Sequence, residues 1–317
     1  MKILVTGASG LVGTALGKAL ARDGHTVCRL LRPGSRTASE KGAAAGTGFD
    51  VAWNPATGEM GGAAVGADAV VHLAGAPIAE GRWTAGRKEL LRSSRVETTR
   101  ALVNALAKMS VRPRVLVCAS ATGYYGDRGE EVLTEESPAG TDFLAGIGQQ
   151  WEGEAVKAEV LGIRVVRARL GMVLARHGGA LAKMLLPFRL GVGGRFGSGR
   201  QWMPWVTLED VVGIFRFALE EAPAGSVLSR MPLSGAVNAV APQPVRNAEF
   251  TQALARALHR PAIFPVPALA LRLTLGEMAG ALLLSSQRVL PQKLEQCGYR
   301  FRHPELRAAL AAVLAAD

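Results

Sequence analysis

The residues with the clearest chemical use stand at the start of the chain, where Gly7, Gly10 and Gly13 recur at every third position. An apolar run at residues 3–5 precedes them, and a helix-like segment at residues 11–21 overlaps their end. Glycine lets the backbone turn sharply and lets a phosphate approach closely, while free N–H groups at a helix start attract negative charge. The pattern predicts a dinucleotide cradle. An ordinary strand-to-helix turn stays open, because the spacing is G-x-x-G-x-x-G rather than G-x-G-x-x-G.

A second group of reactive side chains lies at the end of an apolar run at residues 115–120 and just after it. Ser120 ends this run, and Tyr124 and Tyr125 come shortly after it. In a doubly wound sheet, active-site groups lie beyond the carboxyl ends of the strands. A tyrosine there can move a proton and a serine can orient a carbonyl oxygen, so Tyr124 and Ser120 are the catalytic candidates. The alternative is that both tyrosines pack structurally around a cofactor.

The end of the second apolar run, at residues 26–31, bears on which dinucleotide would bind. Folds that prefer NAD carry Asp or Glu at this point to hold the ribose hydroxyls. Here the run ends in Leu31 and Arg32, and Arg36 follows four residues later. Guanidinium groups suit a 2′-phosphate, so the sequence favours NADP(H) over NAD. Solvated loop arginines are the other interpretation.

The elements that would position these residues alternate along the first half of the chain. Apolar runs predict strands at residues 26–31, 49–53, 69–73, 115–120 and 163–169. Helical patterns fall at residues 11–21, 84–109 and 142–161. Such alternation predicts an α/β fold with a parallel sheet and helices on both of its faces. After residue 170, glycine-rich loops separate further helices expected at residues 180–190, 207–221, 247–258 and 304–315.

Composition limits the remaining function classes. No apolar run is long enough to span a membrane, because Arg272 and Glu277 interrupt the best candidate, residues 265–284. The three cysteines are far apart and form no metal-binding pattern, so we expect no metal and a reducing compartment, cytoplasmic or the interior of an organelle. We expect no presequence before the first strand, although one could already have been removed.

The net charge of +11 permits an acidic partner such as nucleic acid, a membrane surface or a phosphorylated ligand. The arginines are scattered, with no basic run of five to eight residues and no aromatic-interleaved basic patch, so nucleic-acid binding is not favoured, and a protein partner on the basic surface stays open. The plainer interpretation is solubility, with a few arginines placed on an anionic cofactor.

The motifs together resemble the extended short-chain dehydrogenase/reductase superfamily. The glycine turn, Leu73-Ala74-Gly75, and Ser120 with Tyr125-Gly126 carry this resemblance. Other stretches are similar to an atypical branch, the epimerase family proteins, which resemble NAD-dependent epimerases and dehydratases and have a characteristic C-terminal domain. These stretches are residues 82–84, 94–99, 120–126, 151–152, 186–191, 197–202 and 237–242.

The resemblance implies a Rossmann-type doubly wound sheet of seven or so parallel strands with a smaller C-terminal α+β lobe. It implies an NADP-binding domain at residues 1–222, whose loops at about 171–205 contribute to the substrate lobe, and a C-terminal lobe at residues 223–317. The cofactor-binding residues that it and the turn indicate are Gly7, Ser9, Gly10, Leu11, Val12, Gly13, Leu31, Arg32, Arg36, Leu73, Ala74, Gly75, Arg95 and Ser120.

The chain departs from the superfamily at the residues that carry the chemistry. The superfamily uses Ser or Thr, Tyr, and Lys four residues after that Tyr; the matching positions here hold Ala121, Leu144 and Gly148. No Tyr-x-x-x-Lys occurs in the sequence, and Arg95 replaces the usual Asn. Two functions for an unknown small-molecule substrate or partner stay open. One is an NADP-dependent oxidoreductase or epimerase-like enzyme with non-standard acids. The other is a non-catalytic NADP-binding sensor, assembly factor or accessory subunit.

Four other side chains are expected to be structural. Asp142 suits a helix N-cap, and Glu152 on the same helix is assigned a surface or packing role. His72 is expected to be packed or bonded to backbone, because no ligand partner accompanies it. At least one of Trp202 and Trp205 is expected in the core, although both could wall a substrate cleft.

Overall fold

A mostly parallel sheet forms the centre of the fold. The computed structural model describes residues 1–32, 48–220 and 232–315. The strand order is β12-β8-β6-β5-β1-β2-β3-β4, and every neighbouring pair is parallel except β3 with β4. The strands are β1 (Lys2–Thr6), β2 (Thr26–Leu31), β3 (Gly48–Asn54), β4 (Glu59–Met60), β5 (Ala69–His72), β6 (Val115–Ala121), β8 (Arg164–Leu170) and β12 (Gly235–Ala239). The predicted Rossmann-type doubly wound sheet is confirmed.

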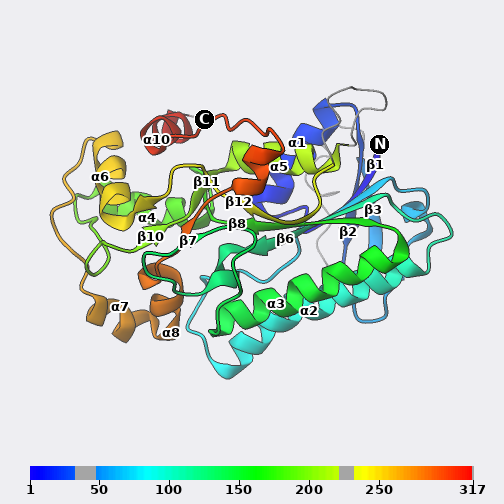
Figure 1. Ribbon diagram of the computed structural model, residues 1–317, viewed down its shortest axis with the longest axis horizontal. Helices are drawn as coiled ribbons and strands as arrows, with labels where there is room; N and C mark the ends of the chain where they lie inside the picture. The colour runs from blue at the N-terminus through cyan, green and yellow to red at the C-terminus, as the bar shows by residue number, and fades with distance from the viewer. Residues whose placement is uncertain (33–47, 221–231, 316–317) are drawn as a thin grey trace.

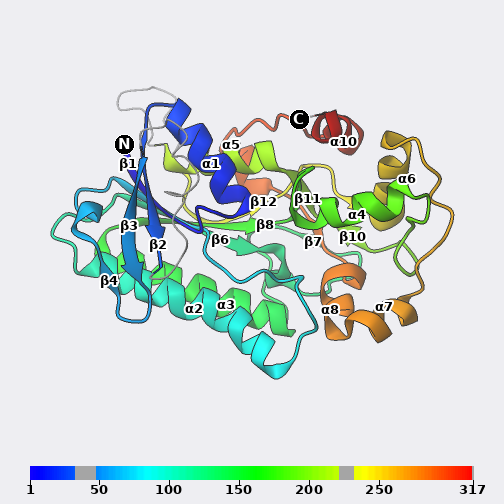
Figure 2. The same cartoon turned by 180° about the vertical axis from the view of Figure 1, so that it is seen from behind.

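Helices cover both faces of this sheet. Figures 1 and 2 show α1 (Leu11–Arg22) and α5 (Leu208–Leu219) on one face, and α2 (Ala85–Ala107) and α3 (Phe143–Val156) on the other. The strand order reverses between β1 and β5, since β2 lies on the far side of β1. A ligand crevice forms outside the carboxyl ends of the strands at such a reversal.

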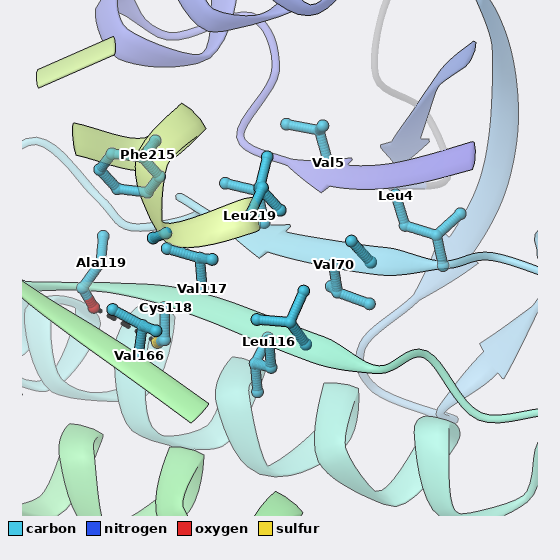
Figure 3. Close-up of a cluster of buried hydrophobic side chains, with 14 of the residues drawn as sticks. Leu4, Val5, Val70, Leu116, Val117, Cys118, Ala119, Val166, Phe215 and Leu219 are labelled. Carbon is cyan, nitrogen blue, oxygen red and sulfur yellow. Dashed lines mark hydrogen bonds between the residues drawn. The ribbon is translucent and has the colours of Figure 1, made fainter. Parts of the chain in front are cut away.

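The core lies on both faces of the sheet because the central strands β1, β5 and β6 are mostly apolar. In Figure 3, Phe215 and Leu219 of α5 lie on one face, close to Val117 of β6. These three side chains belong to one buried cluster that also includes Val5 and Val70 from the two strands flanking the reversal. Apolar runs without alternation are typical of parallel strands buried on both faces. The core therefore holds the ends of β1, β5 and β6 in a rigid row.

Much of the chain beyond β8, apart from α5 and β12, builds a smaller region beside the carboxyl ends of the strands (Figure 1). Three two-stranded ladders tie it together: β10 with β13, β11 with β9, and β14 with β7. Their bounds are β7 (Val132–Leu133), β9 (Met172–Leu174), β10 (Trp202–Met203), β11 (Trp205–Thr207), β13 (Val245–Arg246) and β14 (Arg288–Val289). The helices of this region are α4 (Gly179–Arg189), α6 (Asn247–Ala257), α7 (Ala268–Leu275), α8 (Glu277–Ala279) and α10 (Leu306–Ala315), whereas α9 (Gln292–Gln296) packs on β12 with Leu294 in the core of the sheet.

The division of the chain at residues 222 and 223 stays a prediction, because both residues lie outside the described ranges. Strand β12 comes after that point, yet it pairs with β8 and forms the edge of the central sheet. In the described part of the chain, no helix is both long enough and apolar enough to cross a membrane.

Candidate functional site

The turn between β1 and α1 has room for glycine alone at two of its three positions. Gly7 has a φ of +65°, and a Cβ there would lie 2.7 Å from the carbonyl carbon and oxygen of Leu73. A Cβ at Gly13 would lie 2.3 Å from the carbonyl oxygen of Gly7. Contacts this short between a Cβ and backbone do not occur, so both glycines are required by the close approach of α1, β1 and the chain after β5.

The first turn of α1 presents its N–H groups without a side chain to satisfy them. Gly10 is the N-cap, and no side chain accepts a hydrogen bond from this helix end. Ser9 and Gly10 are exposed, while Leu11 and Val12 are half-buried. A helix start of this kind binds anions, because its unpaired N–H groups and the helix dipole both favour negative charge. The geometry suits the pyrophosphate of a dinucleotide.

A buried histidine fixes the glycine turn to its neighbours. Thr6 Oγ1 accepts hydrogen bonds from the N–H groups of Leu73 at 3.1 Å and Ala74 at 3.2 Å, so its own proton goes to His72 Nδ1, 2.7 Å away. His72 Nε2 then donates to Thr99 Oγ1 at 2.9 Å, and Thr99 donates to the carbonyl of Arg95 at 2.6 Å. The packed histidine expected from the sequence is confirmed, and its partners are threonine side chains.

We expect this histidine to make the protein less stable in mild acid. Burial lowers the pKa of His72 from 6.5 to about 4, so between those values the unfolded chain takes up a proton that the folded chain excludes. The free energy of unfolding should fall by about 3 kcal/mol more in the native chain than in His72→Asn as the pH drops from about 7 to about 4. Urea unfolding of both proteins across this range measures the difference, and parallel pH profiles would contradict the assignment.

The end of β2 carries the residues predicted to select the cofactor. Leu31 is half-buried and Arg32 is exposed. The neighbouring residue Leu30 pairs with Thr6, the last residue of β1, so Leu31 and Arg32 lie close to the glycine turn. Arg36 lies outside the described residues. The β2 end as described has an arginine where NAD-preferring folds have an acid.

Arg95 lies against the loop after β5, and its cofactor role stays a prediction. Its guanidinium donates to the carbonyls of Leu91 at 3.1 Å and Ala76 at 3.0 Å and packs over the ring of Trp151. A Cβ at Gly75 would lie 3.3 Å from Arg95 Cζ, so this guanidinium touches the small-residue loop directly. Burial, aided by the charge of Arg87, lowers the pKa of Arg95 to about 10. It therefore stays cationic at neutral pH.

Beneath the carboxyl ends of β6 and β8 lies a buried ion pair that the sequence analysis did not find. Arg169 contacts Glu152 through Nε to Oε1 at 2.8 Å and Nη2 to Oε2 at 2.9 Å, and both side chains are almost fully buried. Ser120 donates to the same Oε1 at 2.7 Å, and Arg167 approaches Oε2 at 3.3 Å. The surface role assigned to Glu152 is wrong, although the structural role is right. The available signal was three arginines, Arg164, Arg167 and Arg169, within one seven-residue strand, since a buried cation needs a carboxylate partner.

The two tyrosines have different roles. Tyr125 is buried and donates to Asn238 Oδ1 at 2.7 Å, while Arg169 donates to its hydroxyl at 2.9 Å. Burial raises the pKa of Tyr125 to about 12 against the opposing charge of Arg169, so this phenol stays protonated and structural. Tyr124 is half-buried, and its ring lies over the Arg169 guanidinium at 3.6 Å. Among the described residues, none forms a hydrogen bond with the Tyr124 hydroxyl.

Leu144 and Gly148, which match the superfamily's tyrosine and lysine, are both closely packed against the turn at residues 123–124. Leu144 Cβ would lie 3.3 Å from a Cβ at Gly123. A Cβ at Gly148 would lie 3.3–3.4 Å from Cα, Cβ and Cδ2 of Tyr124, so the tyrosine occupies the space above this glycine. A lysine at position 148 would have to displace Tyr124. The local packing around Tyr124 therefore leaves no space for the superfamily's lysine.

Two other expectations concern side chains at the edge of the site. Asp142 caps α3, since its side chain accepts a hydrogen bond from the N–H of Ala145 at 2.9 Å, as predicted. Trp205 is fully buried, which confirms the expectation that at least one of the two tryptophans lies in the core. Trp202 is half-buried and donates to Glu130 at 2.9 Å.

Comparison with known proteins agrees with this architecture. The NAD dependent epimerase/dehydratase family matches residues 3–229, and a domain of unknown function, DUF1731, matches residues 266–313. Epimerase family protein ML0860 of Mycobacterium leprae is 40% identical over 310 residues, which cover 98% of this chain and 94% of that protein. Epimerase family protein YfhF of Bacillus subtilis is 36% identical over 316 residues, covering 99% and 98%.

A solved structure extends the comparison to three dimensions. The crystal structure of human epimerase family protein SDR39U1 (isoform 2) with NADPH superposes with a TM-score of 0.83 at 33% identity, covering 99% of both chains. The family, the fold and the C-terminal domain therefore agree across the whole length. The chain belongs to the NAD-dependent epimerase/dehydratase family of extended short-chain dehydrogenases/reductases, in the branch of the epimerase family proteins.

Proposed function

We propose that the protein binds NADP(H) at the turn between β1 and α1 and acts as an oxidoreductase or epimerase-like enzyme on a small carbonyl or hydroxyl compound. The observation that carries the proposal is the glycine turn. Gly7 and Gly13 leave no room for a Cβ, and the start of α1 has no side-chain cap. Both features suit a bound pyrophosphate.

The choice of NADP(H) rests on two arginines and on a relative. Arg32 stands at the β2 end, where an acid would favour NAD, and Arg36 completes the predicted pair. The human relative was crystallised with NADPH. Arg95 and the loop of Leu73, Ala74 and Gly75 would contact the same cofactor. We expect the protein in a reducing compartment, because Cys28, Cys118 and Cys297 are all free thiols.

The chemistry we propose uses Tyr124 in place of the missing tyrosine and lysine. When bound, NADP(H) supplies a hydride to a substrate carbon or takes one from it. Tyr124 would hold or move the proton at the substrate oxygen, because its hydroxyl is not committed to any described residue. Arg169 lies against the ring and Gly148 lies beneath it, and these contacts orient the phenol. Ser120 is a weaker candidate, since its proton is already donated to Glu152.

Cofactor binding can be tested with two alanine substitutions on the same helix. Gly13→Ala places a methyl group against the Gly7 carbonyl, whereas Gly17→Ala meets nothing within 4 Å. Relief of this overlap would shift the start of α1 relative to β1, so NADPH affinity should fall about tenfold or more in Gly13→Ala and stay unchanged in Gly17→Ala. NADPH fluorescence titration gives both dissociation constants, with NADH titrated alongside for preference. Equal affinities in the two variants would refute a cofactor site at this turn.

A non-catalytic NADP(H)-binding role is the second candidate. The committed hydroxyl of Ser120 and the apolar Leu144 and Gly148 favour it, because none of these residues can exchange a proton with a substrate. The decisive measurement is NADPH oxidation with a broad panel of aldehydes and ketones. Tight NADPH binding without oxidation of the cofactor would support a sensor, assembly factor or accessory subunit over the enzyme.

A further inference from the structure

Large apolar side chains protrude from one edge of the smaller region. In the described residues fourteen large apolar side chains are exposed, and seven of these fall within two short segments. One segment contributes Leu186, Leu190 and Val192, and the other contributes Ile263, Phe264, Leu269 and Leu273, each between 58% and 72% exposed. Apolar side chains gathered in this way mark an interaction surface on a protein.

The two segments lie against each other. Arg260 Nε donates to the carbonyl of Arg189 at 3.0 Å, and the N–H of Val266 donates to the carbonyl of Arg195 at 2.8 Å. Helix α7 follows directly, with Leu271 buried and Leu269 and Leu273 on its exposed side. Figures 1 and 2 both place the chain between α6 and α7 at the outer edge of the molecule, far from the N-terminus.

Unpaired cations accompany these apolar side chains. Residues 160–208 and 250–276 contain no Asp or Glu. Lys183, Arg189, Arg195, Arg260 and Arg272 are exposed, and within the described ranges none of them forms an ion pair with a carboxylate. The nearby carboxylates are already used, since Glu80 lies 3.9 Å from Arg87, and Glu277 pairs with Lys88. We call the seven apolar and five basic side chains the apolar–basic face.

We propose that the apolar–basic face docks the protein on an anionic lipid membrane. Membrane-surface proteins use protruding apolar side chains, which enter the headgroup boundary, together with Lys and Arg, which are drawn to anionic lipids. A lipid surface needs no complementary shape, which fits side chains that protrude rather than line a groove. A second copy of the chain would bring two sets of unpaired cations together and is disfavoured by their repulsion.

Docking would also bring the chain between β5 and α2 close to the membrane. Lys183 on α4 donates to the carbonyl of Ala79 at 2.9 Å, and Arg82 donates to the carbonyl of Leu273 at 3.2 Å. The loop that follows Gly75 therefore contacts both α4 and α7, the two helices that contribute residues to the apolar–basic face. The proposal stands independently of the proposed chemistry, because it rests on surface side chains alone.

Flotation of the full-length chain with lipid vesicles tests the proposal. We expect binding to vesicles of phosphatidylcholine mixed with phosphatidylglycerol, and none to phosphatidylcholine alone. Replacing Leu269 and Leu273 with glutamine should weaken binding at least about tenfold, because two apolar anchors are lost. The matched control replaces Val111 and Val160 with glutamine; both are exposed and lie outside the face, so binding should persist.

A second variant, which changes two arginines, tests the proposal even if the variant with Leu269 and Leu273 replaced does not fold. Arg189→Glu with Arg272→Glu should abolish flotation without touching an apolar residue. No flotation of the native chain, or unchanged flotation of either variant, overturns the proposal. The proposal is also overturned if the native chain does not bind vesicles but forms a dimer, and the leucine variant is monomeric. The apolar–basic face would then be covered by a second copy of the chain.

Discussion

Replacing Glu152 with alanine is expected to lower the free energy of unfolding by about 3–5 kcal/mol. The substitution leaves the guanidinium of Arg169 buried without its carboxylate, and it also removes the acceptor for the Ser120 hydroxyl. Removing one partner of a buried ion pair destabilises a protein by far more than the intact pair stabilises it, because the remaining charge has neither water nor a counter-ion. Urea unfolding at neutral pH measures the loss.

Glu130→Ala is the matched control for this prediction. Glu130 pairs with Arg246 in a similar hydrogen-bonded geometry, but its side chain is 67% exposed. Solvent screens such a pair, so its removal should destabilise the protein far less than the removal of Glu152. If the two substitutions destabilised the protein equally, the interior around Glu152 would have to be wet, and the ion pair would not organise the ends of β6 and β8.

Tyr124→Phe is expected to reduce turnover about hundredfold or more while leaving NADPH affinity unchanged. The substitution removes only the hydroxyl. Phenylalanine keeps the ring over Arg169 and above Gly148, so neither the fold nor the glycine turn should change. The rate of NADPH oxidation with an active compound from the aldehyde and ketone panel is the measurement, accompanied by the dissociation constant of NADPH.

Tyr299→Phe serves as the control tyrosine. Its hydroxyl donates to the carbonyl of Asp210 at 3.1 Å, far along the chain from the site residues. This variant should keep the native turnover. Full activity in Tyr124→Phe would remove Tyr124 as the proton carrier, and equal losses in both variants would point to a stability effect instead.

The sheet and its order of elements could be predicted because the signals are local. Apolar runs without alternation marked β2, β5, β6 and β8 to within a residue or two. The stretch at residues 142–161 was predicted as one helix; α3 ends at Val156 and a tighter 3₁₀ turn continues to Leu161. The edge strand β12 was not predicted, because Gly235 and Asn238 interrupt its apolar residues, and its pairing with β8 defines it.

The glycine turn shows what the sequence by itself determined. Gly7, Gly10 and Gly13 predict a close-packed strand-to-helix turn, since backbone conformation and the missing Cβ are properties of the residues themselves. The arginine at the end of β2 and the missing tyrosine–lysine pair are likewise visible as residue types at fixed distances along the chain. Local conformation, residue type and spacing require no knowledge of long-range contacts.

The tertiary structure alone decided what surrounds those residues. Ser120, Glu152 and Arg169 meet only because β6, α3 and β8 pack together, and their pairing commits the Ser120 hydroxyl that the sequence offered for catalysis. Tyr124 rests on Gly148 for the same reason. Burial and hydrogen bonding depend on which distant segments share the interior. The sequence therefore could not predict that Glu152 is buried, because its burial depends on Arg169, which β8 places against α3.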